Sequence, residues 1–82
     1  MWGDMPANND ELWAERAKRF FKAELKRADV TYDDLADRLS KMGLPETKAS
    51  IANKISRGTF SAAFLMASLK AIGCQNLRVD DL

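Results

Sequence analysis

The stretch that decides the fold spans residues 47–60 and reads TKASIANKISRGTF. Ile51 and Ile55 lie four positions apart, so they share one side of a helix. The hydroxyl of Thr47 can cap the start of this helix. Gly58 tolerates a positive φ angle and lets the chain leave the helix sharply. The pattern therefore predicts one short helix with a buried inner side.

The opposite side of this helix, which we predict over residues 47–56, carries small and polar side chains. Its members are Ala49, Ser50, Asn53, Ser56 and Arg57, with Lys54 at the edge. No acidic residue occurs between Glu46 and Asp80. A short helix whose outer side carries amide, hydroxyl and basic groups suits insertion into the major groove of DNA.

The composition indicates one small globular domain. Of the 82 residues, 46% are apolar and 30% are charged, and a chain of this size buries only about 60–65% of its unfolded surface. No apolar run approaches the ~20 residues that a membrane-spanning helix needs. The first ten residues are polar and acidic, unlike a signal peptide. A single cysteine, Cys74, cannot form an internal disulfide, and a cytoplasmic setting fits best.

The net charge of +1 is small, but the charges are unevenly distributed. Residues 1–13 carry a net −3 and residues 79–82 a net −2, whereas residues 14–78 hold 13 basic and 7 acidic residues, a net +6. A chain with acidic ends and a basic body can present a positive surface to nucleic acid. Many soluble domains share this distribution, so it does not by itself identify the partner.

The rest of the chain is organised around the helix over 47–56. We expect a flexible lead-in over residues 1–9, an all-α domain of four to five short helices over residues 10–73, and a tail over residues 74–82. In the tail, the alternation of Leu77 with Val79 suggests a short extended piece.

Residues 10–28 predict the first helix. The apolar residues at helical spacing, which we expect to be buried, are Trp13, Ala17, Phe20, Phe21, Leu25 and Ala28. Leu44, in the connection before the helix over 47–56, is also expected to be buried.

Two further helices are marked by their capping residues. Thr31 followed by Asp34 is close to a capping box and predicts a helix over 32–42. Ser61 is a good N-cap and predicts a helix over 62–72. Glycines follow the ends of both helices, as is usual where a helix stops.

Two sets of residues resemble the Cro and phage-repressor family of helix-turn-helix DNA-binding domains. They are Tyr32-x-x-Leu35-Ala36-x-x-Leu39 and Ile51-x-Asn53-x-Ile55-x-Arg57-Gly58. The resemblance covers roughly residues 12–73 and implies a lambda-repressor-like helix-turn-helix fold in which residues 47–56 form the recognition helix. The run ANKISRGTFSAAF also looks like a small bacterial family of helix-turn-helix proteins known chiefly as a domain of unknown function. This narrower resemblance implies no established activity.

The spacing departs from that of the Cro family. Ala36 and Ile51 are 15 positions apart, about five more than is usual in helix-turn-helix domains. We therefore expect a lengthened second helix and turn. The recognition helix would then be tilted from the usual docking pose.

The resemblance also implies roles for individual residues. By position, the bases would be read near the helix start by Thr47, Lys48 and Ala49. Asn53 lies farther along the outer side, and asparagine can bond an adenine edge through two hydrogen bonds. The expected phosphate contacts are Tyr32, Ser50, Lys54 and Arg57. Asn53 can instead cap the loop near Gly58, and each of the others can be an ordinary solvated residue.

The leading hypothesis is a small bacterial or phage transcriptional regulator. It would bind double-stranded DNA as a homodimer, because one domain of this size makes few base contacts. The alternative is a protein-interaction module, antitoxin-like or a dimerisation domain, that keeps the fold without specific DNA binding. A continuous positive face over Lys48, Lys54 and Arg57 would favour DNA. An exposed apolar patch that includes Trp2 or Leu77 would favour a protein partner.

The sequence offers little for catalysis. It has no histidine, no cysteine paired with a base, no glycine-rich phosphate loop and no metal-ligand spacing. We therefore expect no enzymatic activity, no cofactor and no metal site.

Overall fold

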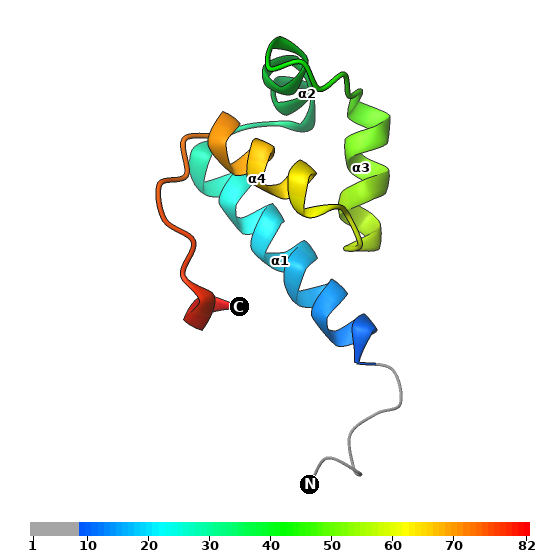
Figure 1. The fold of residues 1–82 in the computed structure, drawn as a ribbon, viewed down its shortest axis with the longest axis vertical. Coiled ribbons are helices and arrows are strands. Elements are labelled where there is room, and N and C mark those ends of the chain that lie inside the picture. Colours follow the sequence, from blue (N-terminus) through cyan, green and yellow to red (C-terminus); the bar gives the residue numbers. More distant parts are fainter. Residues whose placement is uncertain (1–8) are drawn as a thin grey trace, which may run out of the picture.

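The computed structural model describes residues 9–82 (Figure 1). The helices are α1 (Asp10–Ala28), α2 (Tyr32–Lys41), α3 (Lys48–Arg57) and α4 (Ala62–Ala71), followed by a short 3-10 helix, η2 (Val79–Asp81). Residues 9–82 contain no strand, so the predicted all-α fold is confirmed. The expected lead-in, with Trp2, lies outside the described residues except for Asn9. No helix in the described part of the chain is long and apolar enough to cross a membrane.

The predicted capping residues define where helices begin. The Asp34 backbone N–H donates to Thr31 Oγ1 at 3.1 Å, and the Thr31 N–H donates to Asp34 Oδ2 at 3.3 Å. This is the capping box expected before α2. The Phe64 N–H donates to Ser61 Oγ at 3.0 Å and caps α4. The ends are less exact, since α2 and α4 each stop one residue early and α3 lies one residue later than predicted.

The core lies where the four helices meet. Its buried members are Phe21, Leu25, Val30, Leu35, Leu39, Ile51, Ile55 and Phe64. The Phe21 ring lies edge-on to Phe60 with 5.2 Å between ring centroids, and stacks on Phe64 at 5.6 Å. An aromatic cluster of Phe21, Phe60 and Phe64 therefore joins α1 to the start of α4. Ile51 and Ile55 are fully buried, as predicted, and fix the inner side of α3.

The end of α3 rests directly on α1 at Gly58. This residue is buried, has a φ of +69°, and donates its N–H to the Ile55 carbonyl oxygen at 3.1 Å. A Cβ atom at Gly58 would lie 2.2 Å from the carbonyl oxygen of Ala14. Only glycine satisfies both the left-handed backbone and the close approach to α1. We call this contact the Gly58 seat.

Several burial predictions are wrong. Trp13 is 53% exposed, because the side of α1 that carries it faces the tail, which covers it only in part. Ala28, in the last turn of α1, is exposed. Leu44 is 39% exposed, because the connection from α2 to α3 runs over the surface. Val79 begins η2 and does not continue an extended piece from Leu77.

Candidate nucleic-acid interface

The outer side of α3 is exposed and polar. Helix α3 packs on α1 and α2 through its inner side. On α3 itself, the exposed residues that were predicted to contact DNA are Lys48, Ala49, Asn53 and Arg57, and Thr47, the N-cap of the helix, is exposed as well. The structure thus brings three of the predicted base-reading residues and one predicted phosphate contact onto a single solvent-facing helix.

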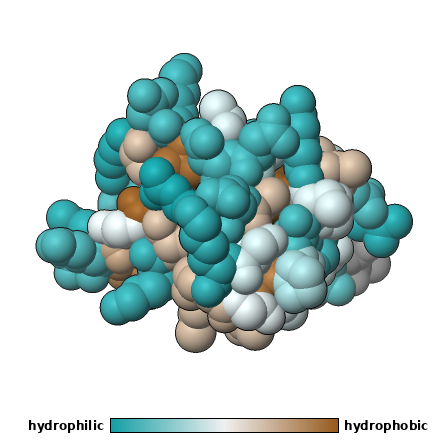
Figure 2. Space-filling view, turned by 90° about the horizontal axis from the view of Figure 1, so that it is seen from above, coloured by the Kyte–Doolittle hydropathy of each residue, from teal (hydrophilic) through white to brown (hydrophobic). Residues whose placement is uncertain are grey.

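The starts of α2 and α3 lie close together. Lys48 Nζ, in the first turn of α3, is 4.0 Å from Oδ2 of Asp33, in the first turn of α2. Tyr32, the predicted phosphate contact at the start of α2, is half-buried against the core. Figure 2 looks down on the end of the molecule that carries α2, where hydrophilic side chains project on several sides. Two positive helix-dipole ends thus lie near one surface, where Asp33 offsets part of the Lys48 charge.

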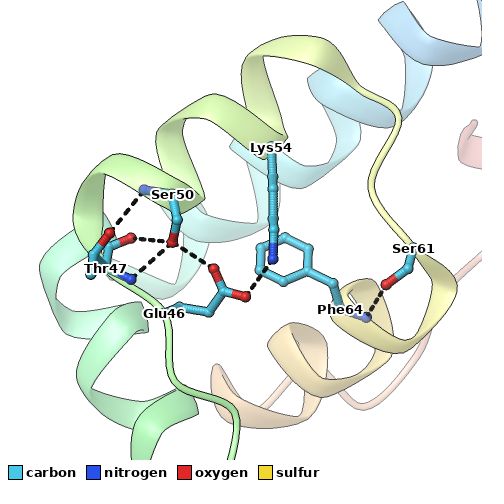
Figure 3. Close-up of polar contacts among 6 residues, drawn as sticks. All are labelled: Glu46, Thr47, Ser50, Lys54, Ser61 and Phe64. Atoms are coloured by element: carbon cyan, nitrogen blue, oxygen red, sulfur yellow. Dashed lines mark hydrogen bonds and ion pairs between the residues drawn. The ribbon is translucent and has the colours of Figure 1, made fainter.

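The side of α3 that faces α4 carries a second set of contacts (Figure 3). Ser50 Oγ donates to Glu46 Oε1 at 2.6 Å, and Lys54 Nζ donates to Glu46 Oε2. The same Nζ lies 4.8 Å from the centroid of the Phe64 ring, a favourable cation–π geometry. The Glu46 side chain is 11% exposed and that of Lys54 is 41% exposed. We call Glu46, Ser50, Lys54 and Phe64 the Glu46 cluster.

In the Glu46 cluster, polar side chains that were predicted to contact DNA form hydrogen bonds within the protein instead. Lys54 and Ser50 bond within the protein, and the Thr47 hydroxyl accepts the Ser50 backbone N–H at 3.0 Å as the cap of α3. Burial by itself would raise the pKa of Glu46. The hydrogen bonds from Lys54 and Ser50 and the charge of Lys54 outweigh this effect, so the pKa lies below its ordinary value. Glu46 is therefore a carboxylate at neutral pH, and it offsets the charge of Lys54.

Sequence reasoning missed Glu46 and Phe64 as parts of this site. The sequence contained one signal for Glu46. Glu46, Ser50 and Lys54 are spaced four positions apart, so they fall on the same side of the helix and of the residue that precedes its N-cap. Phe64 gives no such signal, because it comes from α4 and reaches Lys54 only through the packing of two helices.

A separate apolar groove lies between α1 and the tail. The tail runs along the side of α1 away from α3 (Figure 1). Its lining residues are Trp13, Arg16, Ala17, Phe20, Leu65, Leu77 and Leu82. The guanidinium carbon of Arg16 lies 4.9 Å from the centroid of the Trp13 ring. Trp13 and Leu77 remain 53% and 43% exposed. Leu77 thus meets the condition set for a protein partner, and Trp2 lies outside the described residues.

These features define a small all-α domain in which α3 presents a polar, exposed outer side and an apolar groove lies between α1 and the tail. A family model described as a domain of unknown function (DUF6471) matches residues 13–77. This match spans most of the chain, so the protein belongs to that family, and the predicted resemblance to a domain of unknown function is confirmed. No curated protein and no solved structure matches the chain.

Proposed function

We propose that this protein binds double-stranded DNA as a small transcriptional regulator of bacterial or phage type. Helices α2 and α3 would form a lambda-repressor-like helix-turn-helix unit, with α3 inserted into the major groove. The observation that carries the proposal is the two-sided character of α3. Ile51 and Ile55 are fully buried, whereas Asn53 and Arg57 on the other side are exposed. Amide and basic groups are those that bond base edges and phosphates in the groove.

The proposed contacts divide along α3. Asn53, in the middle of the outer side, would read a base, as would Lys48 and Ala49 near the helix start. Arg57, at the other end, would contact a phosphate. Within residues 9–82, Arg57 has no ion-pair partner, so its full charge is available to DNA. A domain of this size makes few base contacts, and we propose that two copies bind a palindromic site.

The test is selection from a random duplex pool, followed by fluorescence anisotropy over a range of salt concentrations. We expect an enriched, palindromic motif. Asn53→Ala should cost about 1–3 kcal/mol of discrimination at one base position. Arg57→Gln should weaken binding to all sequences and reduce the salt slope by about 0.9.

The control is Lys70→Gln, which removes the same charge from an exposed position on α4, where no DNA contact is proposed. It should leave the salt slope unchanged. If no motif is enriched and Arg57→Gln matches Lys70→Gln, α3 is not a DNA-contacting helix.

A second candidate is a protein-interaction module, either antitoxin-like or a dimerisation domain. The specific observation in its favour is the apolar groove with half-exposed Trp13 and Leu77, since exposed apolar patches mark interaction sites. The positive face is also interrupted, because Asp33 and Glu46 lie beside Lys48 and Lys54.

A partner or second copy seated in the groove would be displaced by a buried charge. Leu77→Asp should therefore lower the mass seen by light scattering without loss of helical signal. Lys70→Gln serves again as the surface control. An unchanged mass in Leu77→Asp would exclude the groove as a self-association surface.

A further inference from the structure

We propose that Glu46 is a charge gate on α3, which withholds Lys54 from DNA phosphates and so limits sequence-independent binding. This inference rests on the proposed function. It assigns Lys54 a role that differs from the phosphate contact predicted from the sequence, and it makes Glu46 a specificity-determining residue that itself touches no base.

The geometry of the Glu46 cluster carries the first step. Figure 3 shows the Lys54 side chain directed toward Glu46 and the Phe64 ring. Both the ion pair and the ring contact at 4.8 Å hold the ammonium group in this position. Because the Glu46 side chain is only 11% exposed, water competes weakly with Lys54 for its carboxylate.

The second step is that Glu46 restrains the Lys54 side chain while leaving it free to change its conformation. The Lys54 side chain is 41% exposed and has a flexible stem, so its ammonium group can turn outward when its partner loses charge. Lys48 lacks a comparable restraint. Its nearest carboxylate, Asp33, is 4.0 Å away, and both side chains are about 70% exposed, so solvent screens that pair.

The third step is the consequence for recognition. Phosphate contacts supply affinity that does not depend on sequence, and each one steepens the dependence of binding on salt. A lysine held away from the backbone therefore lowers non-specific affinity and leaves contacts to base edges unaffected. The ratio of specific to non-specific binding rises as a result.

The decisive variant is Glu46→Gln. Glutamine keeps the shape of Glu46 and still accepts the Ser50 hydrogen bond, but it carries no charge. We expect the slope of log binding constant against log salt to become steeper by about 0.9. Over a fourfold rise in salt, binding should then fall by about 3.5-fold more than it does for the wild type.

Two further variants assign the effect to Lys54. Lys54→Met keeps an apolar stem on Phe64 and removes the charge, and its slope should equal that of the wild type. The double variant Glu46→Gln/Lys54→Met should also return to the wild-type slope. Asp81→Asn is the matched control, because it removes a carboxylate that pairs with Arg78 on the tail, on the other side of α1 from α3. It should leave the slope unchanged.

An unchanged slope in Glu46→Gln, or a slope shallower by about 0.9 in Lys54→Met, would overturn the gate. Elution from heparin, a polyanion without bases, separates this result from failure of the proposed function. If no protein binds duplex DNA at low salt, the proposed function fails. The gate is then upheld only if Glu46→Gln elutes at higher salt than the wild type and the double variant does not. Circular dichroism confirms that each variant is folded.

Discussion

Replacement of Gly58 by alanine tests the most constrained contact in the fold. In the Gly58 seat, the added Cβ would lie 2.2 Å from the Ala14 carbonyl oxygen and 2.8 Å from the carbonyl carbon. Both are backbone atoms in the first half of α1, so no side chain can rotate to relieve the clash. The end of α3 must therefore move away from α1, or α1 must bend.

Two costs add at this position. A left-handed backbone costs a residue with a Cβ about 1–2 kcal/mol, and forcing an extra carbon into a packed contact costs about 1–3 kcal/mol more. We therefore expect Gly58→Ala to lose roughly 2–5 kcal/mol of the free energy of unfolding. A domain of 82 residues has a total of about 4–12 kcal/mol, so this variant should lose a large share of its stability.

Gly43→Ala is the matched control. Gly43 has a φ of +86°, but a Cβ there meets no atom within 4 Å. It should lose only the backbone cost of about 1–2 kcal/mol. Urea unfolding followed by circular dichroism at 222 nm measures both variants. Equal losses in the two variants would show that α3 does not rest on α1 as described.

Three other changes give distinct outcomes. The pKa of folded Glu46 lies below its ordinary value of 4.5, so its contribution to stability is complete above about pH 4.5 and is lost as the pH falls through the folded-state value. Below about pH 4.5, the free energy of unfolding of the wild type, measured with urea, should therefore fall more steeply with decreasing pH than that of Glu46→Gln. Parallel plots of the free energy of unfolding against pH for the two proteins would contradict the ion pair. Ser61→Ala removes the cap of α4 and should lose about 1 kcal/mol by the same assay, whereas Ser61→Asp should retain it. Ile55→Ala leaves a cavity under α3 and should lose about 2–5 kcal/mol, and a loss near zero would place Ile55 outside the core.

Local patterns predicted much of the fold. Thr31 and Ser61 fix helix starts through bonds to residues only three positions away, so the sequence contains both partners. Ile51 and Ile55 define the inner side of α3 through spacing alone. The burial of Trp13 was predicted wrongly, because helical spacing shows which residues share one side of a helix but not what covers that side. In the structure, the tail covers it only in part.

The candidate site was predictable only in outline. The exposed outer side of α3, with Asn53 and Arg57, follows from helical periodicity. The direction of the Lys54 side chain does not, because Glu46 and Phe64 set it from the connection and from α4. The close approach of Gly58 to α1 could likewise not be predicted from the sequence, since it depends on where two helices cross.

The aromatic cluster has a consequence for the newly made chain. Phe21 leaves the ribosome early, but Phe60 and Phe64, which cover its ring, follow only after α3 has been synthesised. Until then the Phe21 ring lacks the two aromatic rings that pack on it, and an open apolar surface invites association with chaperones. A nascent chain that ends at Gly58 would lack the cluster. We therefore expect the domain to fold in one cooperative step only after α4 has left the exit tunnel.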